Sequence, residues 1–108
     1  MESTADQTKE KQMAERAAIV TGASSGIGLA IAQMLGEQGY GLTVAARRPE
    51  KLEAAAKTLT DQGFDVLSIP ADLGEEEAIA GVVKSHEERF GRLDVLVNNA
   101  GVGFGELA

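Results

Sequence analysis

The sequence predicts an α/β fold in which helices flank a parallel sheet. Short apolar runs rich in β-branched residues alternate with segments of helical periodicity, and glycines cluster at the joints between them. The chain has 108 residues, of which 44% are hydrophobic, and this is the size and composition of one small globular domain. Strict alternation of strand and helix favours parallel pairing, and right-handed crossovers place the strands in the order 3-2-1-4, counted along the chain.

The elements follow one another with short connections. Strands are expected over residues 17–21, 42–46, 64–70 and 93–97. Helices are expected over about 25–38, from Pro49 to about 62, and from about residue 74, with Gly39 ending the first in the left-handed conformation. The apolar positions that predict the buried helix faces are Ile27, Ile31, Met34 and Leu35 in the first, Leu52, Ala55, Ala56 and Leu59 in the second, and Ile79, Val82, Val83 and Phe90 in the third.

Charge and cysteine content exclude several classes of function. Seventeen acidic and ten basic residues give a net charge of −7, which repels nucleic acid and anionic membranes, so neither is an expected partner. The absence of cysteine excludes disulfides, zinc thiolate sites and a cysteine nucleophile, and no metal site is expected. Residues 1–15 are polar and carry no signal-peptide core, so we expect a flexible tail before a domain over 16–108, in the cytoplasm.

A glycine-rich segment, T-G-A-S-S-G-I-G, joins the first strand to the first helix, where a dinucleotide-binding loop would lie. Gly22 would permit the tight turn, Gly26 would let the backbone approach a pyrophosphate, and Gly28 would let the helix pack closely. Free N–H groups at the helix start and the two serine hydroxyls could donate to phosphate or ribose. The alternative is a glycine-rich turn whose serines only cap the helix. The candidate binding residues are Gly22, Ser24, Ser25, Gly26, Ile27 and Gly28.

A basic pair, Arg47 and Arg48, ends the second strand. Sites specific for NAD place an Asp or Glu about 20 residues beyond the glycine loop to bind the ribose 2′-hydroxyl, and no acid stands there. Guanidinium groups can pair with a 2′-phosphate or stack over adenine. A solvated basic pair is the alternative, although cations just before a helix amino end oppose the helix dipole unless an anion is bound. The pair therefore favours NADP(H) over NAD as the cofactor.

Two motifs together resemble the short-chain dehydrogenase/reductase family. The glycine loop is similar to the family's T-G-x-x-x-G-I-G, in its compact subtype because Ser25 stands where the extended subtype has glycine, and residues 98–101 match the second signature, N-N-A-G. The resemblance implies a Rossmann-type sheet, truncated here after the fourth strand. It also implies that the N-N-A-G turn, with Asn99, Ala100 and Gly101, ties the central strands together beside the adenosine end of the cofactor.

The same resemblance gives a role to Asp72, whose carboxylate would accept the adenine amino group while the backbone of Leu73 meets a ring nitrogen. A helix-capping role is the alternative for this aspartate, and both roles can hold at once. His86, the one histidine, falls near the predicted stripe of the third helix, far from the loop ends, and is expected to be structural or superficial.

The family's proton relay has no counterpart in this sequence. The resemblance implies a serine and a tyrosine with a lysine four residues later, but the one tyrosine is Tyr40 and position 44 is Val44. No catalytic residue is therefore expected. We expect an incomplete half-domain that binds the cofactor of an oxidoreductase acting on a small carbonyl or alcohol, or else a non-catalytic nucleotide- or partner-binding module. The open edge of the fourth strand predicts self-association.

Overall fold

The computed structural model describes residues 15–99 as a parallel sheet flanked by helices, and residues 1–14 and 100–108 lie outside this description. The sheet order is β4-β3-β2-β5, with every neighbouring pair parallel. This confirms the predicted order 3-2-1-4. The elements are β2 (Arg16–Thr21), α2 (Gly26–Glu37), β3 (Tyr40–Ala46), α3 (Pro49–Asp61), β4 (Val66–Pro70), α4 (Glu76–Phe90) and β5 (Val95–Asn98).

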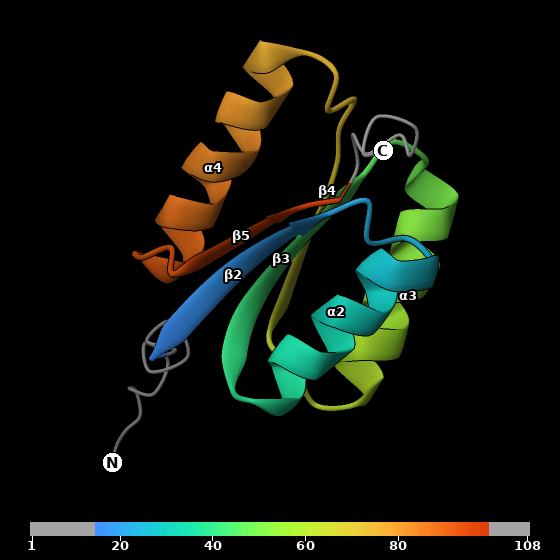
Figure 1. The fold of residues 1–108 in the computed structure, drawn as a ribbon, viewed down its shortest axis with the longest axis vertical. Helices are drawn as coiled ribbons and strands as arrows, with labels where there is room; N and C mark the ends of the chain where they lie inside the picture. Colours follow the sequence, from blue (N-terminus) through green and yellow to red (C-terminus); the bar gives the residue numbers. More distant parts are fainter. Residues whose placement is uncertain (1–14, 100–108) are drawn as a thin grey trace, which may run out of the picture.

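The helices cover the sheet from both sides, with α2 and α3 on one face and α4 on the other (Figure 1). The larger core cluster joins β2 and β3 to α3 through Val20, Val44 and Leu52, and a smaller one joins Ile19 to Val82 of α4. The two central strands are therefore buried on both faces, as their continuous apolar runs predict.

Three elements start later than predicted, β4 at Val66, β5 at Val95 and α4 at Glu76, and side-chain hydrogen bonds lie at the start of the last two. β5 begins at Val95, and the preceding Asp94 bonds to Ala17 twice: its backbone N–H donates to the Ala17 carbonyl oxygen at 2.9 Å, and its Oδ2 accepts from the Ala17 N–H at 2.9 Å. The hydrogen bonds from Arg92, and then the one from Ala17, lower the pKa of Asp94 below its ordinary value. α4 begins at Glu76, and not near 74, because Asp72 closes a turn before it: its Oδ1 accepts from the Gly74 N–H at 3.1 Å.

The buried face predicted for α2 was wrong at two of its four positions, while Leu35 packs against the core. Ile27 is 71% exposed and Met34 is 49% exposed. The buried positions of this helix are instead three small residues at intervals of four, Gly28, Ala32 and Gly36. Small residues let the helix axis approach its neighbours closely, so the periodicity of large apolar side chains identified the helix but not its inner face.

The face of α4 also differs from the prediction at one position. Ile79 is 41% exposed, whereas Val82, His86 and Phe90 are buried. The inward stripe thus contains the histidine, at intervals of four residues.

His86 has a structural role, and the superficial alternative was wrong. Its Nε2 lies 2.8 Å from the carbonyl oxygen of Arg92, which can only accept, so Nε2 carries the proton in the neutral ring. Nδ1 then accepts from the Thr43 hydroxyl at 2.7 Å. These two bonds join α4 to the central strand β3 and to the segment that leads into β5.

We predict that folding stability falls as His86 becomes protonated. Burial lowers its pKa below the ordinary 6.5, so the unfolded chain binds the proton first. The stabilisation is complete above pH 6.5 and is lost as the pH falls from 6.5 towards the folded-state pKa. Because the chain has one histidine, an NMR titration of its ring signals is unambiguous. A folded-state pKa at or above 6.5 would contradict the prediction.

We predict opposite effects of alanine at two helical glycines. A Cβ at Gly36 would lie 2.5 Å from Cδ2 of Phe64, so Gly36→Ala should destabilise the fold by about 1–3 kcal/mol through overpacking. A Cβ at Gly81 meets nothing within 4 Å, so Gly81→Ala should stabilise it by about 0.5–1 kcal/mol through helix propensity. Urea unfolding of both variants tests the pair, and equal signs would refute the packing described for α2.

Candidate functional site

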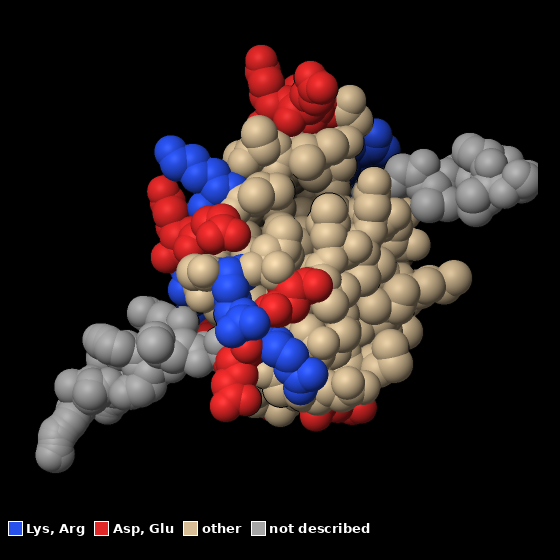
Figure 2. Space-filling model, turned by 60° about the vertical axis from the view of Figure 1, so that its left-hand side comes forward, with Lys and Arg blue, Asp and Glu red and all other residues tan. Residues whose placement is uncertain are grey.

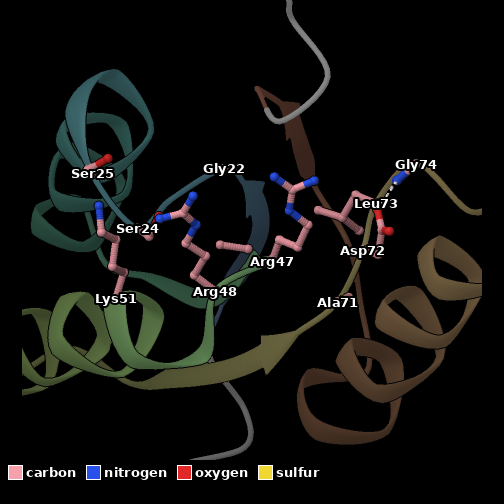
Figure 3. Close-up of a pocket in the computed structure, with 11 residues that line it drawn as sticks. Gly22, Ser24, Ser25, Arg47, Arg48, Lys51, Ala71, Asp72, Leu73 and Gly74 are labelled. Carbon is pink, nitrogen blue, oxygen red and sulfur yellow. Dashed lines mark hydrogen bonds between the residues drawn. The ribbon is translucent and has the colours of Figure 1, made fainter.

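A groove of about 520 Å³ lies where β2, β3 and β4 end. Ligands of open parallel sheets bind at this carboxyl edge, beside the loops that follow the strands. The walls come from three segments: the glycine loop after β2, the basic segment after β3 and the turn after β4 (Figure 3). The lining residues are Gly22, Ser24, Ser25, Ala46, Arg47, Arg48, Lys51, Ala71, Asp72, Leu73 and Gly74.

The glycine loop has the geometry that its sequence predicts. Gly22 and Gly26 have φ values of 66° and 61°, in the left-handed region that favours glycine. A Cβ at Gly28 would lie 2.1 Å from the carbonyl oxygen of Gly22, so only glycine permits this approach of α2 to the loop. At Gly26 a Cβ would meet nothing within 4 Å, and the backbone is open on that side.

The serines of the loop line the groove and make no capping hydrogen bond to α2. Ser25 occupies the N-cap position of α2, yet its side chain makes no capping hydrogen bond. Ser24 and Ser25 both line the groove (Figure 3). Their hydroxyls make no hydrogen bond to any residue in the described part of the chain and are available to a bound molecule.

Three cations line the groove, one more than the sequence analysis identified. Arg47 and Arg48 follow β3 as predicted, and Lys51 joins them from the first turn of α3. Within residues 15–99 the ion pairs are Lys57–Asp61, Arg89–Asp65 and Arg92–Asp94, so no carboxylate neutralises the three groove cations. The spacing of three between Arg48 and Lys51, which places both on one side of a helical turn, is the signal that could have found the lysine.

The cations diverge within the groove. Figure 3 shows Arg48 and Lys51 extending towards the side formed by Ser24 and Ser25, while Arg47 extends towards the side of Leu73. The site therefore offers one guanidinium near the turn after β4 and a guanidinium with an ammonium near the glycine loop.

Asp72 and Leu73 lie in the wall opposite the glycine loop. The N-cap of α4 is Glu75, so Asp72 stabilises the preceding turn and does not cap the helix directly. Its Oδ2 accepts no hydrogen bond from residues 15–99, which leaves one carboxylate oxygen available as an acceptor.

Asn98 and Asn99 tie β5 to β2, as the resemblance implies. The Asn99 N–H donates to the Thr21 hydroxyl oxygen at 2.9 Å, and its Nδ2 donates to the carbonyl oxygen of Gly22 at 3.3 Å. The Thr21 hydroxyl lies 3.2 Å from Oδ1 of Asn98. Asn99 does not line the groove but holds the loop that does; Ala100 and Gly101 lie outside the described residues.

Comparison with known proteins agrees with this geometry. Residues 16–108 match the family model for short chain dehydrogenases. The chain belongs to the short-chain dehydrogenase family. It is 43% identical over 90 residues to the uncharacterized oxidoreductase YxjF of Bacillus subtilis, covering 83% of this chain and 35% of YxjF. It is 42% identical over 88 residues to the 3-oxoacyl-[acyl-carrier-protein] reductase FabG of Staphylococcus aureus, covering 81% of this chain and 36% of FabG.

Solved structures show the same short-chain dehydrogenase architecture. Actinorhodin polyketide ketoreductase, as a variant with NADPH, aligns with a TM-score of 0.77 at 43% identity, covering 80% of this chain and 33% of that one. The L-sorbose reductase of Gluconobacter frateurii, in complex with NADPH and L-sorbose, aligns with a TM-score of 0.78 at 40% identity, covering 84% of this chain and 35% of that one. The chain thus spans about a third of the length of these relatives.

Tyr40 lies away from the groove. It begins β3, at the amino end of the sheet, where its ring centroid lies 4.7 Å from the guanidinium of Arg16. Val44 is fully buried in the core. Neither residue lines the groove at the carboxyl edge.

We predict that Thr21→Val loosens the loop. Valine keeps the shape but leaves the Asn99 N–H without its acceptor, at a cost of about 1–3 kcal/mol in the free energy of unfolding. Thr58→Val is the matched control, since that hydroxyl bonds to Ala54 on an exposed helix surface, and its cost should stay below about 0.5 kcal/mol. Denaturant unfolding measures both, and equal costs would contradict a specific role for the threonine at the loop.

Proposed function

We propose that this chain binds NADP(H) as the cofactor-binding half of an oxidoreductase that acts on a small carbonyl or alcohol. The observation that carries the proposal is the groove at the carboxyl edge, where a glycine loop faces three cations that have no carboxylate partner within residues 15–99. The solved relatives described above are complexes with NADPH, which supports the same cofactor here.

The residues present fit a dinucleotide that carries a 2′-phosphate. A pyrophosphate needs close backbone donors, and the left-handed glycines with the open backbone at Gly26 supply the space for them. A 2′-phosphate needs cations, and Arg47 and Arg48 follow β3 where an NAD site would have an acid. The one carboxylate in the groove, that of Asp72, lies in the wall after β4.

We assign a binding role to each segment on this basis. Gly22, Ser24, Ser25, Gly26, Ile27 and Gly28 form the pyrophosphate loop, Arg47 and Arg48 meet the 2′-phosphate and the adenine, and Asp72 and Leu73 meet the adenine edge. Asn99 is a positioning residue that holds the loop through the carbonyl of Gly22. In the segment that follows, Ala100 and Gly101 keep the adenosine-side role implied by the family's second signature.

The chemistry follows from the cofactor and the family. When bound, the nicotinamide exchanges a hydride with the substrate, and this chain's own residues bind and orient the adenosine and pyrophosphate portion. No Tyr-x-x-x-Lys occurs in the 108 residues, so we propose that they bind cofactor without turning over a substrate. The same observation favours a second candidate, a non-catalytic nucleotide-binding module.

We further propose a cytoplasmic protein without nucleic-acid or membrane partners, in keeping with the net charge of −7. No helix in the described part of the chain is long and apolar enough to cross a bilayer. Figure 2 shows a broad area without charged side chains on one side of the molecule. Leu96 of the edge strand β5 is 54% exposed, and self-association would bury it.

We predict that the chain prefers NADP⁺ to NAD⁺. Calorimetry should give a Kd for NADP⁺ below about 1 mM and binding of NAD⁺ at least about tenfold weaker. Arg47→Asp should weaken NADP⁺ by about 2 kcal/mol, because it replaces a cation of the groove by an anion. Lys84→Asp, an equal charge change on α4, should leave the preference unchanged. Absence of heat with either nucleotide would refute both candidate functions.

A further inference from the structure

We propose that Lys51 is a specificity-determining residue, which forms with Arg48 the seat of the ligand's 2′-phosphate. The inference rests on the proposed NADP(H) function and deepens it. It concerns a residue outside the glycine loop and outside the basic pair at the end of β3.

The backbone brings Lys51 and Arg48 together. Arg48 is the N-cap of α3, with extended backbone angles of φ −95° and ψ 111°, and Lys51 is the third helical residue after Pro49 and Glu50. Both side chains are exposed and line the groove. Figure 3 shows both extending to the side of the groove formed by Ser24, so an ammonium and a guanidinium flank the same space.

The helical positions that face Lys51 carry no negative charge. Residues three and four positions away along a helix are its neighbours, and for Lys51 these are Arg47, Arg48, Ala54 and Ala55. Lys57 of the same helix has a carboxylate in that relation, Asp61, and pairs with it at 3.0 Å.

The acidic residues nearest to Lys51 in the sequence, Glu50 and Glu53, are one and two positions away and so do not face it on the helix. Three cations that share one groove repel one another, and a bound dianion removes that repulsion. The cluster is therefore matched to a ligand with concentrated negative charge.

Because the cations diverge, they bind different parts of the ligand. Arg47 extends towards Leu73, in the wall assigned to the adenine. Arg48 and Lys51 remain near the loop, where a phosphate on the adenosine ribose can accept from a planar guanidinium fork and a compact ammonium. An adenosine ligand without the 2′-phosphate gives Lys51 nothing to bind, so the lysine acts on specificity and not on general affinity.

The test is calorimetry of the full chain with adenosine 2′,5′-bisphosphate and with 5′-AMP. Lys51→Gln should weaken the bisphosphate about tenfold and 5′-AMP less than about twofold, since only the former carries the extra phosphate. Lys57→Gln removes the same charge from the same helix and should leave both affinities within about twofold. Lys51→Arg should retain most of the bisphosphate affinity.

The outcomes separate this inference from the proposed function. If the unaltered chain prefers the bisphosphate and Lys51→Gln keeps that preference, Lys51 has no part in specificity and the inference fails alone. Equal weakening by Lys57→Gln would show a general effect of charge and would also overturn it. If the unaltered chain does not distinguish the two ligands, the proposed NADP(H) function fails and the role of Lys51 fails with it.

Discussion

The close approach of Gly28 to Gly22 is the constraint on which the site depends. The 2.1 Å that would separate a Cβ at Gly28 from the carbonyl oxygen of Gly22 leaves no room for any side chain. This contact brings the first turn of α2 directly over the end of β2. The N–H groups at the start of α2 are unpaired within the helix, so the same contact determines where donors meet a ligand at the carboxyl edge of the sheet.

The loop is held from the other side by residues far away in the chain. Asn99 donates to the carbonyl of Gly22 and to the hydroxyl of Thr21, across sequence separations of 77 and 78 residues. The Asn99 side chain also lies 2.9 Å from the position that a Cβ of Gly28 would take, so helix, loop and β5 meet at one point. Contacts from the end of β5 therefore support the glycine loop from across the sheet.

The sequence analysis predicted the strand order and the loop correctly because both follow from strong local signals. The alternation of apolar strands and periodic helices is compatible with few topologies. The turns at Gly22 and Gly39 require a positive φ, which glycine adopts readily. It failed where small or polar side chains decide the packing. α2 buries Gly28, Ala32 and Gly36, which carry no hydrophobic signal, and Asp94 before β5 bonds to Ala17 through its carboxylate as well as its backbone.

The sequence analysis missed Lys51 for a different reason. Lys51 alone resembles any exposed residue of an amphipathic helix. Its spacing of three from Arg48 points to a shared site once the fold places both beside the glycine loop. The glycine loop holds a ligand through backbone geometry, which does not distinguish NADP(H) from NAD(H), because both carry the same pyrophosphate. In the proposed site, discrimination comes from the start of α3, which carries Arg48 and Lys51. α2 and α3 pack on the same face of the sheet, so the glycine loop and the start of α3 rest on one core.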